Sequence, residues 1–461
     1  MSAAIGAAAD ADVARSEDGA VSAKPSGLVT IRALAGSASG SFGLNIVSTV
    51  ATVLATAALA RIMDLTAFGI YSWVVATIYL LTLPAVLGID RLVIRDVAVY
   101  VGQAAFGHIR GLLRRSAELM AVTCTVICLG VLLVMWLDGS LGSPTGVALA
   151  IGLVSLPLLA FGRLAQSALV GVHQIVVGQA PDLLVRPLVL LAIVAFVLIA
   201  GMTHLDAPAA VTLYTLSTAA GLAAALYLMR GRLAGAVKTV RPEFESRRWV
   251  GAAFALALLS GGAVANGQIG VTLLGVLGKP EAAGLYAVAQ RGALTVAFPL
   301  LGLGAALAPT AARLWSTGHV VELQRLITIG TRGVLLAALP IAFVCVVFGG
   351  QVLGLVFGAS FVAAASALAL LSLAQLVNTA TGSVQTLLIM TGNTPLAGVG
   401  IAIGLFANVV LAVLLIPGYH EMGAAVAFAT SLIVTNLIHV VIARHYLGID
   451  TTPFGAAMRS A

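Results

Sequence analysis

Long apolar segments, most of them 20 residues or more, alternate along this chain with short segments that carry charges, Gly and Pro. A segment of about 20 apolar residues crosses the hydrocarbon core of a bilayer as an α-helix. A helix also satisfies its own backbone hydrogen bonds in lipid. The pattern therefore predicts an all-α membrane protein with about twelve transmembrane helices. The expected spans are 37–60, 68–90, 117–137, 147–171, 183–203, 208–229, 252–276, 283–312, 330–350, 362–390, 395–416 and 422–443.

Composition supports a membrane protein over a soluble one. Of the 461 residues, 60% are hydrophobic and only 9% are charged, whereas soluble domains have about 25% charged residues. The net charge of +7 suggests nucleic acid as one partner, but the bases lie in short loops between the spans. The positive-inside rule explains that placement without a polyanion.

The bases also predict the orientation. Even-numbered loops are basic: the second holds Arg91, Arg95, Arg110, Arg114 and Arg115, and residues 230–248 hold six more bases. The opposite loops carry little more than Arg61 and Lys279. We therefore expect both termini in the cytoplasm, in a multi-pass protein of the bacterial plasma (inner) membrane.

A repeat relates the two halves of the chain. Ala67-Phe68-Gly69-Ile70-Tyr71 returns about 215 residues later as Ala282-Ala283-Gly284-Leu285-Tyr286, and the same shift carries spans one to six onto spans seven to twelve. Because six is even, both halves have the same orientation, which predicts two six-helix lobes related by a pseudo-two-fold axis along the membrane normal. The expected division is a disordered cytoplasmic tail (1–35), an N-terminal lobe (36–229), a basic cytoplasmic linker (230–250), a C-terminal lobe (251–445) and a cytoplasmic tail (446–461).

The repeat has one informative mismatch, Ala76 in the first copy against Arg291 in the second. Arg291 lies about nine residues into its predicted span, near the bilayer midplane at 1.5 Å per residue. An unpaired cation there costs at least about 2.5–3.5 kcal/mol, and Asp90, Glu118 and Asp182 fall near the ends of the predicted spans. We infer a wetted cavity and an anionic cargo, since a guanidinium suits phosphate oxygens. A salt bridge to a neighbouring helix is the structural alternative.

Other polar residues inside or beside the spans complete the predicted sites. Amides either join helices or line the cavity toward sugar hydroxyls; the candidates for cavity lining, with Arg291, are Gln290, Asn266, Gln268, Asn45, Gln375 and Asn378. Bases at the span ends either snorkel to lipid headgroups or attract an anion. The candidates for a basic entrance are Arg91, Arg95, Arg163, Arg186 and Arg332, and those for the exit are Arg61 and Lys279.

No motif in the chain indicates catalysis. We find no phosphate-binding glycine loop, intramembrane metalloprotease motif or serine nucleophile elbow, so we expect no enzyme, no catalytic residue and no cofactor. Cys124 and Cys128 share a helix face but lack further metal ligands, which favours packing over a metal site. The sequence does not distinguish protons from sodium ions as the coupling ion.

The order of short motifs resembles a known family. The first span ends in Leu59-Ala60-Arg61, the second opens with Phe68-Gly69-Ile70-Tyr71, and Arg95-Asp96-Val97-Ala98 follows. This order resembles the polysaccharide-export (O-antigen and exopolysaccharide repeat-unit) flippases of the multidrug/oligosaccharidyl-lipid/polysaccharide exporter superfamily, in which Leu-Ala-Arg, Phe-Gly-Leu-Tyr and an Arg-Glu-type motif are typical. Ile70 and Asp96 depart mildly from that pattern. Gly284-Leu285-Tyr286 with Ala289-Gln290-Arg291 looks like the family's eighth-span signature.

The resemblance covers residues from about 30 to 445 and implies a function. It implies a flippase that translocates an undecaprenyl-diphosphate-linked oligosaccharide to the periplasmic leaflet, with Arg291 contacting the cargo and membrane lipids around it. A polysaccharide polymerase and a chain-length regulator are the implied protein partners. Members often have fourteen spans, so a lipid-tail groove built from two extra helices is not carried over.

Two other classes of function are alternatives to a flippase. A cation-coupled multidrug or toxin extruder of the same superfamily is the alternative transporter, and it is expected to carry an acid deep in a lobe. A membrane glycosyltransferase or polymerase needs catalytic acids and a large extracytoplasmic loop, and the sequence shows neither.

Overall fold

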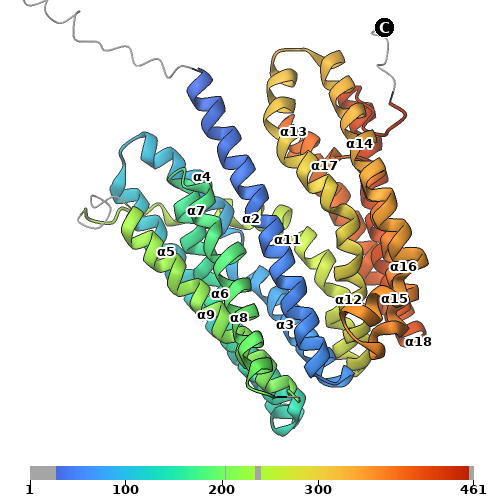
Figure 1. Ribbon diagram of the computed structural model, residues 1–461. Coiled ribbons are helices and arrows are strands. Elements are labelled where there is room, and N and C mark those ends of the chain that lie inside the picture. Colours follow the sequence, from blue (N-terminus) through green and yellow to red (C-terminus); the bar gives the residue numbers. More distant parts are fainter. Residues whose placement is uncertain (1–26, 203, 234–239, 456–461) are drawn as a thin grey trace, which may run out of the picture. The chain divides into compact units, whose positions relative to one another are not determined.

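The computed structural model describes residues 27–202, 204–233 and 240–455 (Figure 1). Within these ranges, the side chains of 27–39, 42, 246–248 and of 250–260 lie outside the description. The chain divides into a unit that ends at Gly40 and a unit that begins at Ser41. The first unit contains the start of helix α2, and the contacts and cavities described below belong to the second unit.

The described residues form helices and connecting turns, with no strand among them. The helices of the first half are α2 (Gly27–Ile62), α3 (Leu65–Val86), α4 (Ile89–Gly102), α5 (Phe106–Leu137), α6 (Pro144–Gly171), α7 (Ile175–Ala180), the π-helix η2 (Pro181–Val185), α8 (Arg186–Ile199) and α9 (Ala207–Arg232). The helices of the second half are α11 (Ser246–Val276), α12 (Pro280–Leu294), η3 (Thr295–Ala297), α13 (Phe298–Ser316), α14 (Val320–Val347), α15 (Gly349–Val356), η4 (Ala359–Ala364), α16 (Ala365–Ala380), α17 (Val384–Met390), α18 (Thr394–Ile442) and η5 (Ala443–Leu447).

Several helices begin where the sequence supplies a cap. The side chains of Asp64, Ser143 and Asp206 accept hydrogen bonds from backbone N–H groups three residues later, at the starts of α3, α6 and α9. A proline follows the cap in α6 and α9, where its missing N–H costs nothing. These signals fix the membrane entry points of spans whose interiors are almost uniformly apolar.

The number of spans agrees with the predicted number of about twelve. Ten stretches of the described chain are long and apolar enough to cross a membrane. One of them, Thr394–Leu447, is an antiparallel pair that reverses at His420, a residue with non-helical φ 49° and ψ −124°. Across this hairpin the ring of His439 lies 2.8 Å from the carbonyl oxygen of Ala397. Helix α11, with 31 residues, occupies the position of the predicted seventh span.

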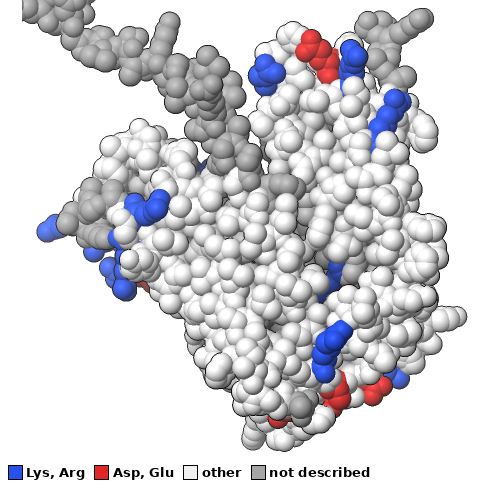
Figure 2. All heavy atoms as spheres, viewed as in Figure 1, with Lys and Arg blue, Asp and Glu red and all other residues white. Residues whose placement is uncertain are grey.

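The outward faces of the helices are apolar, as lipid contact requires. On α5, Val122, Val126, Leu129 and Leu133 are all more than half exposed and follow the helical repeat. Figure 2 shows small groups of charged side chains separated by broad uncharged areas. In water such a surface would promote aggregation, whereas in a bilayer it is the normal lipid-facing surface.

The largest differences from the predicted elements lie near the ends of spans. Helix α4 is amphipathic and occupies what the sequence pattern assigned to a loop. The predicted span 362–390 ends at Ala380, and α17 is a separate short helix. Helix α2 begins at Gly27, so residues 27–35 are helical rather than part of a disordered tail, while 1–26 lie outside the described residues.

Glycines bring the two halves together at a crossing of repeat-related helices. Gly69 of α3 and Gly284 of α12 occupy equivalent positions, and a Cβ on Gly69 would overlap the carbonyl oxygen of Pro280. A Cβ on Gly284 would lie only 3.2 Å from the Cα of Gly69. The repeated motif is therefore the place where the lobes touch backbone to backbone, which only glycine allows.

Further contacts join the lobes at the same end of the bundle. Thr66 donates a 2.9 Å hydrogen bond to Glu281, which is its partner in the repeat. The rings of Phe68 and Phe361 meet edge to face at 5.2 Å, and Arg61 donates to the carbonyl oxygens of Leu355 and Val356. We refer to this region, residues 61–69 with 279–284 and 355–361, as the joined end.

The linker and the C-terminal segment are both attached to the lobes. Val240 and Glu243 of the predicted linker contact α5. The carbonyl of Val240 accepts a 2.8 Å hydrogen bond from Arg110, and the carboxylate of Glu243 lies 3.0 Å from the ring of His108. In the predicted C-terminal tail, Ile449 and Thr451 are buried. Residues 448–455 therefore pack on the C-terminal lobe, while 234–239 and 456–461 lie outside the described residues.

Candidate functional site

Arg291 lies inside the bundle, in the last turn of α12. It follows Pro280, the first residue of the helix, by eleven residues, or about 16 Å at 1.5 Å per residue. Its Nη1 donates to the hydroxyl oxygen of Thr56 on α2, and that hydroxyl donates in turn to the carbonyl of Thr52 at 2.7 Å. Within the described part of the chain no carboxylate forms an ion pair with Arg291. Its recorded partner is neutral, and its charge is not neutralised locally.

A cavity of about 470 Å³ begins at Arg291. Its polar lining consists of Arg291, three hydroxyl residues of α2 and two amides of α16. Its other walls are apolar side chains of α2, α12, α13 and α18 and of the short turn η3. The full lining is Ser48, Thr49, Thr52, Val53, Arg291, Leu294, Ala297, Phe298, Leu300, Leu301, Gln375, Asn378 and Leu432.

The cavity extends from Arg291 away from the joined end. On α2 its lining residues precede Thr56, whereas the joined end begins at Arg61. On α12 and α13 its lining residues follow Arg291, whereas the joined end lies at 279–284. The cavity therefore lies on the side of Arg291 that is away from the crossing of α3 and α12.

A line of amides leads from the cavity into the C-terminal lobe. Asn378 donates to Gln375 at 3.0 Å, and Asn436 of α18 donates to Asn378 at 3.0 Å. Each amide orients the next, so the groups that Gln375 and Asn378 present to the cavity are held in place.

The remaining predicted amides lie elsewhere. Asn266 of α11 accepts from Asn408 at 2.7 Å and joins α11 to α18. Gln290 donates to the carbonyl of Gly267 at 2.9 Å, which joins α12 to α11. Asn45 donates to the carbonyl of Ser41 on its own helix, and Gln268 is not among the cavity-lining residues. In these contacts Asn266 and Gln290 act as interhelical links.

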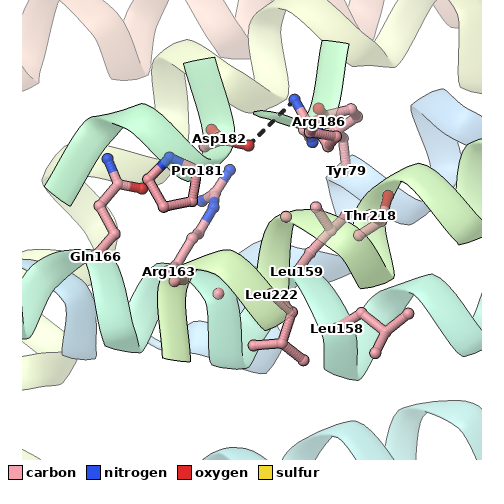
Figure 3. Close-up of a pocket in the computed structure, with 13 residues that line it drawn as sticks. Tyr79, Leu158, Leu159, Arg163, Gln166, Pro181, Asp182, Arg186, Thr218 and Leu222 are labelled. Carbon is pink, nitrogen blue, oxygen red and sulfur yellow. Dashed lines mark ion pairs between the residues drawn. The ribbon is translucent and has the colours of Figure 1, made fainter. Parts of the chain in front are cut away.

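Arg186, predicted for the entrance, lies in a small pocket of about 30 Å³ within the N-terminal lobe (Figure 3). Its guanidinium pairs with Asp182 at 3.2 Å and lies 5.7 Å from the centre of the Tyr79 ring. Asp182 is the eighth residue of the span Ile175–Ile199. The expectation that this acid sits at a span end was wrong, because the helix begins eight residues earlier than predicted and passes through the π-turn η2. His439 of α18 is also buried.

The other predicted entrance bases do not gather in one place. Arg91 and Arg163 line a cavity of about 110 Å³ with Asp90 and Gly261, and Arg163 also lines the Arg186 pocket. Arg95 pairs at 2.7 Å with the buried Asp96. Arg332 donates to the carbonyl of Pro453 at 2.6 Å, in the C-terminal lobe. Arg91, Arg163 and Arg186 thus form a connected basic group, and Arg95 and Arg332 have local partners.

The two predicted exit bases lie at the joined end. Arg61 binds the last carbonyls of α15, and Lys279 is the exposed residue that precedes α12. Arg61 therefore links the lobes in this conformation.

The hydroxyl residues of α2 were not singled out from the sequence. Ser48, Thr52 and Thr56 recur every four residues, so they share one face of α2. This spacing was visible in the sequence, but serine and threonine are common in membrane helices, where they usually bond to their own backbone. Ser48 and Thr52 are distinguished by lining the cavity, and Thr56 is distinguished by its hydrogen bond with Arg291.

Comparisons with known proteins give both a family and a fold. Residues 37–315 match the model of the family described as polysaccharide biosynthesis protein. No curated protein sequence matches the chain.

Three solved structures of transporters share the fold. An inward-facing multidrug resistance MATE family transporter of the MOP superfamily is 13% identical, with 87% of this chain and 95% of that chain covered and a TM-score of 0.71. The lipid II flippase MurJ, in an inward closed conformation, is 9% identical over 87% of each chain, with a TM-score of 0.63. A MOP superfamily transporter from Pyrococcus furiosus is 13% identical over 90% of this chain and 95% of that chain, with a TM-score of 0.60. The helices therefore have the arrangement of the MOP superfamily.

Proposed function

Because the chain belongs to the polysaccharide biosynthesis protein family, we propose that it is a flippase for a lipid-diphosphate-linked oligosaccharide, the repeat unit of a cell-surface polysaccharide. The observation that carries this proposal is the cation of Arg291, which has no carboxylate partner among the described residues and opens onto a cavity of about 470 Å³. A cation held in a largely apolar cavity strongly favours an anionic group nearby.

The cavity suits the three chemical parts of such a cargo. The planar guanidinium of Arg291 presents paired N–H donors to phosphate oxygens. Gln375, Asn378 and the α2 hydroxyls offer donors and acceptors for sugar hydroxyls. The apolar walls formed by Leu294, Phe298 and Leu301 tolerate the first part of the lipid, whose remainder stays in the bilayer.

The arrangement of the lobes supports transport by alternating access. With the orientation that the positive-inside rule predicts, the joined end faces the periplasm, and the cavity opens toward the cytoplasmic leaflet. Opening the joined end while the opposite end closes would move the diphosphate across the membrane on Arg291 without exposing it to hydrocarbon. This proposal does not depend on whether protons or sodium ions drive the transport.

Replacement of Arg291 tests the cargo role. In a strain that lacks the native copy, we expect Arg291→Ala to abolish surface polysaccharide and to accumulate the lipid-linked repeat unit, while Arg291→Lys retains part of the export because it keeps the charge. Arg313→Ala is the matched control, since Arg313 is exposed at the far end of α13. Expression and thermal stability in detergent should match the wild type.

Two outcomes would contradict the proposal. Full export by a well-expressed Arg291→Ala variant would exclude the cargo role of Arg291. Unchanged polysaccharide in a strain without the protein, together with increased sensitivity to cationic drugs, would favour the multidrug extruder. A feature in favour of that alternative is Asp182, a carboxylate inside a span, although it is paired with Arg186.

A further inference from the structure

A second large cavity lies outside the central site, on the N-terminal lobe. It is a groove of about 440 Å³ between α5, α6 and α9. Its apolar lining includes Leu113, Phe161, Leu164, Leu226 and Met229, and Arg110 and Arg114 are its charged lining residues. It shares no residue with the cavity at Arg291, so it is a separate site.

The two arginines lie one helical turn apart near the start of α5. Arg110 and Arg114 are four and eight residues after Phe106, or about 6 and 12 Å along the helix. Helix α5 has 32 residues, or about 48 Å, which exceeds the ~30 Å hydrocarbon core. Both arginines are therefore suited to the headgroup layer, with the apolar floor of the groove beside the acyl chains.

The rim of the groove carries a net positive charge. Arg114 pairs with Glu118 at 3.0 Å, and Arg115 shares the same carboxylate at 3.2 Å. One carboxylate thus faces the two guanidinium groups of Arg114 and Arg115. The Arg114 side chain is 64% exposed and uses its Nε for Glu118, so its outer nitrogens stay available to an anion.

We propose that this groove binds an anionic phospholipid of the surrounding membrane. An acyl chain would lie against Leu113, Phe161 and Leu226, and the phosphate would accept hydrogen bonds from Arg110 and Arg114. A free phosphate ion would leave the apolar floor uncovered. Basic pockets between membrane helices at the cytoplasmic surface suit anionic headgroups in this way.

A lipid at this position also touches both attachments of the linker between the lobes. Leu233, the last described residue before the linker gap, lines the groove, and Arg110 donates to the carbonyl of Val240 just after that gap. The bound lipid therefore stabilises the attachment of Leu233 and Val240 to the N-terminal lobe, and anionic lipid should raise the thermal stability of the protein.

Native mass spectrometry with defined lipids tests the site. The probes are dioleoyl phosphatidylglycerol and, as the neutral comparison, dioleoyl phosphatidylcholine. We expect the delipidated wild type to bind phosphatidylglycerol more tightly than phosphatidylcholine, and the Arg110→Gln/Arg114→Gln variant to lose roughly 25-fold in that affinity, at about fivefold per arginine. Arg313→Gln/Arg325→Gln is the matched control, because it removes two exposed bases from the other lobe.

A second variant tests the apolar half of the groove without changing charge. Ala117 lines the groove and is half-buried, so Ala117→Phe should fill it and remove the preference for phosphatidylglycerol. It should also remove the rise in melting temperature that this lipid causes in the wild type. Equal loss in the control pair, or unchanged binding in Ala117→Phe, would overturn the site. Displacement of phosphatidylglycerol from the wild type by equimolar undecaprenyl phosphate would overturn the assignment to a membrane phospholipid.

Discussion

At the scale of single residues, the glycines at the crossing of α3 and α12 decide how closely the lobes approach. Gly69 faces the backbone of Pro280, and Gly284 faces Gly69 itself. Neither neighbour is a flexible side chain that could move aside. A methyl group at either glycine must separate two helix backbones, and the Thr66–Glu281 hydrogen bond lies one turn away.

We predict that Gly69→Ala destabilises the protein by about 1–3 kcal/mol, the usual cost of overpacking. The measurement is the melting temperature in detergent. Gly130→Ala is the control, because Gly130 lies on α5 with no atom within 4 Å of an added Cβ. The control should be neutral or slightly stabilising, since alanine favours a helix over glycine by about 1 kcal/mol. A Gly69→Ala variant as stable as the control would show that the lobes are not held at this crossing.

The sequence identified some site residues and missed others for a physical reason. Arg291 could be found because a cation in an apolar run has a high cost, which needs a compensating partner. Asn378 and Asn266 are equally polar in sequence, yet one lines the cavity and the other joins α11 to α18. Which face of a helix an amide occupies depends on packing, and uniformly apolar spans give little information about it.

At the scale of elements, the C-terminal segment 448–455 is tied to α14 by a row of polar side chains. Gln324 donates to the carbonyl of Asp450 at 2.6 Å and accepts from its N–H at 2.8 Å. Arg332, two turns further along α14, binds the carbonyl of Pro453. Without this segment, the buried side chain of Gln324 would lose its hydrogen-bond partners on Asp450. The segment is therefore part of the packed C-terminal lobe.

We predict that Gln324→Ala releases this segment. It removes both hydrogen bonds to Asp450 and leaves a buried N–H and a carbonyl without partners, at about 1–3 kcal/mol for each unsatisfied group. Hydrogen exchange of residues 448–455 should rise by at least tenfold, whereas Gln351→Ala, at an exposed glutamine of α15, should leave it unchanged. Unchanged exchange in Gln324→Ala would mean that the burial of Ile449 and Thr451 and the remaining hydrogen bonds, such as that from Arg332, hold the segment without Gln324.

Element types could be predicted from the sequence better than element ends. Hydropathy located every span because lipid requires long apolar helices. It missed α4, whose buried face is short and includes the charged Asp96, while Arg91 and Arg95 lie on the exposed face. It also placed the start of the fifth span too late, because the residues before Asp182 form a short helix that only the π-turn joins to α8.

At the scale of the whole molecule, the joined end is a set of contacts that alternating access must break. Thr66 and Glu281 are hydrogen-bonded across the lobes at 2.9 Å. Ser155 and Thr215 are also hydrogen-bonded, at 2.8 Å, but both belong to the N-terminal lobe. The two pairs therefore differ in whether the proposed motion separates them.

We predict that an oxidised Thr66→Cys/Glu281→Cys pair blocks export and that a reducing agent restores it. The Ser155→Cys/Thr215→Cys pair, cross-linked in the same way, should leave export intact. Both pairs are made in a background in which Cys124, Cys128 and Cys345 are replaced, and polysaccharide is measured with and without reductant. Full export with the lobes cross-linked would exclude opening at the joined end.

The contact of Gly69 with Gly284 has a consequence for how the chain acquired its asymmetry. Two separate six-helix subunits meeting through this glycine would form an isologous dimer, in which every substitution occurs twice. A dimer of that kind with arginine at this position would bury two cations, one in each subunit, and like charges inside one bundle repel each other. Fusion into a single chain removes that constraint, because one copy keeps Ala76 while the other carries Arg291. The covalent link thus permits a single positive charge in a framework that is otherwise symmetric.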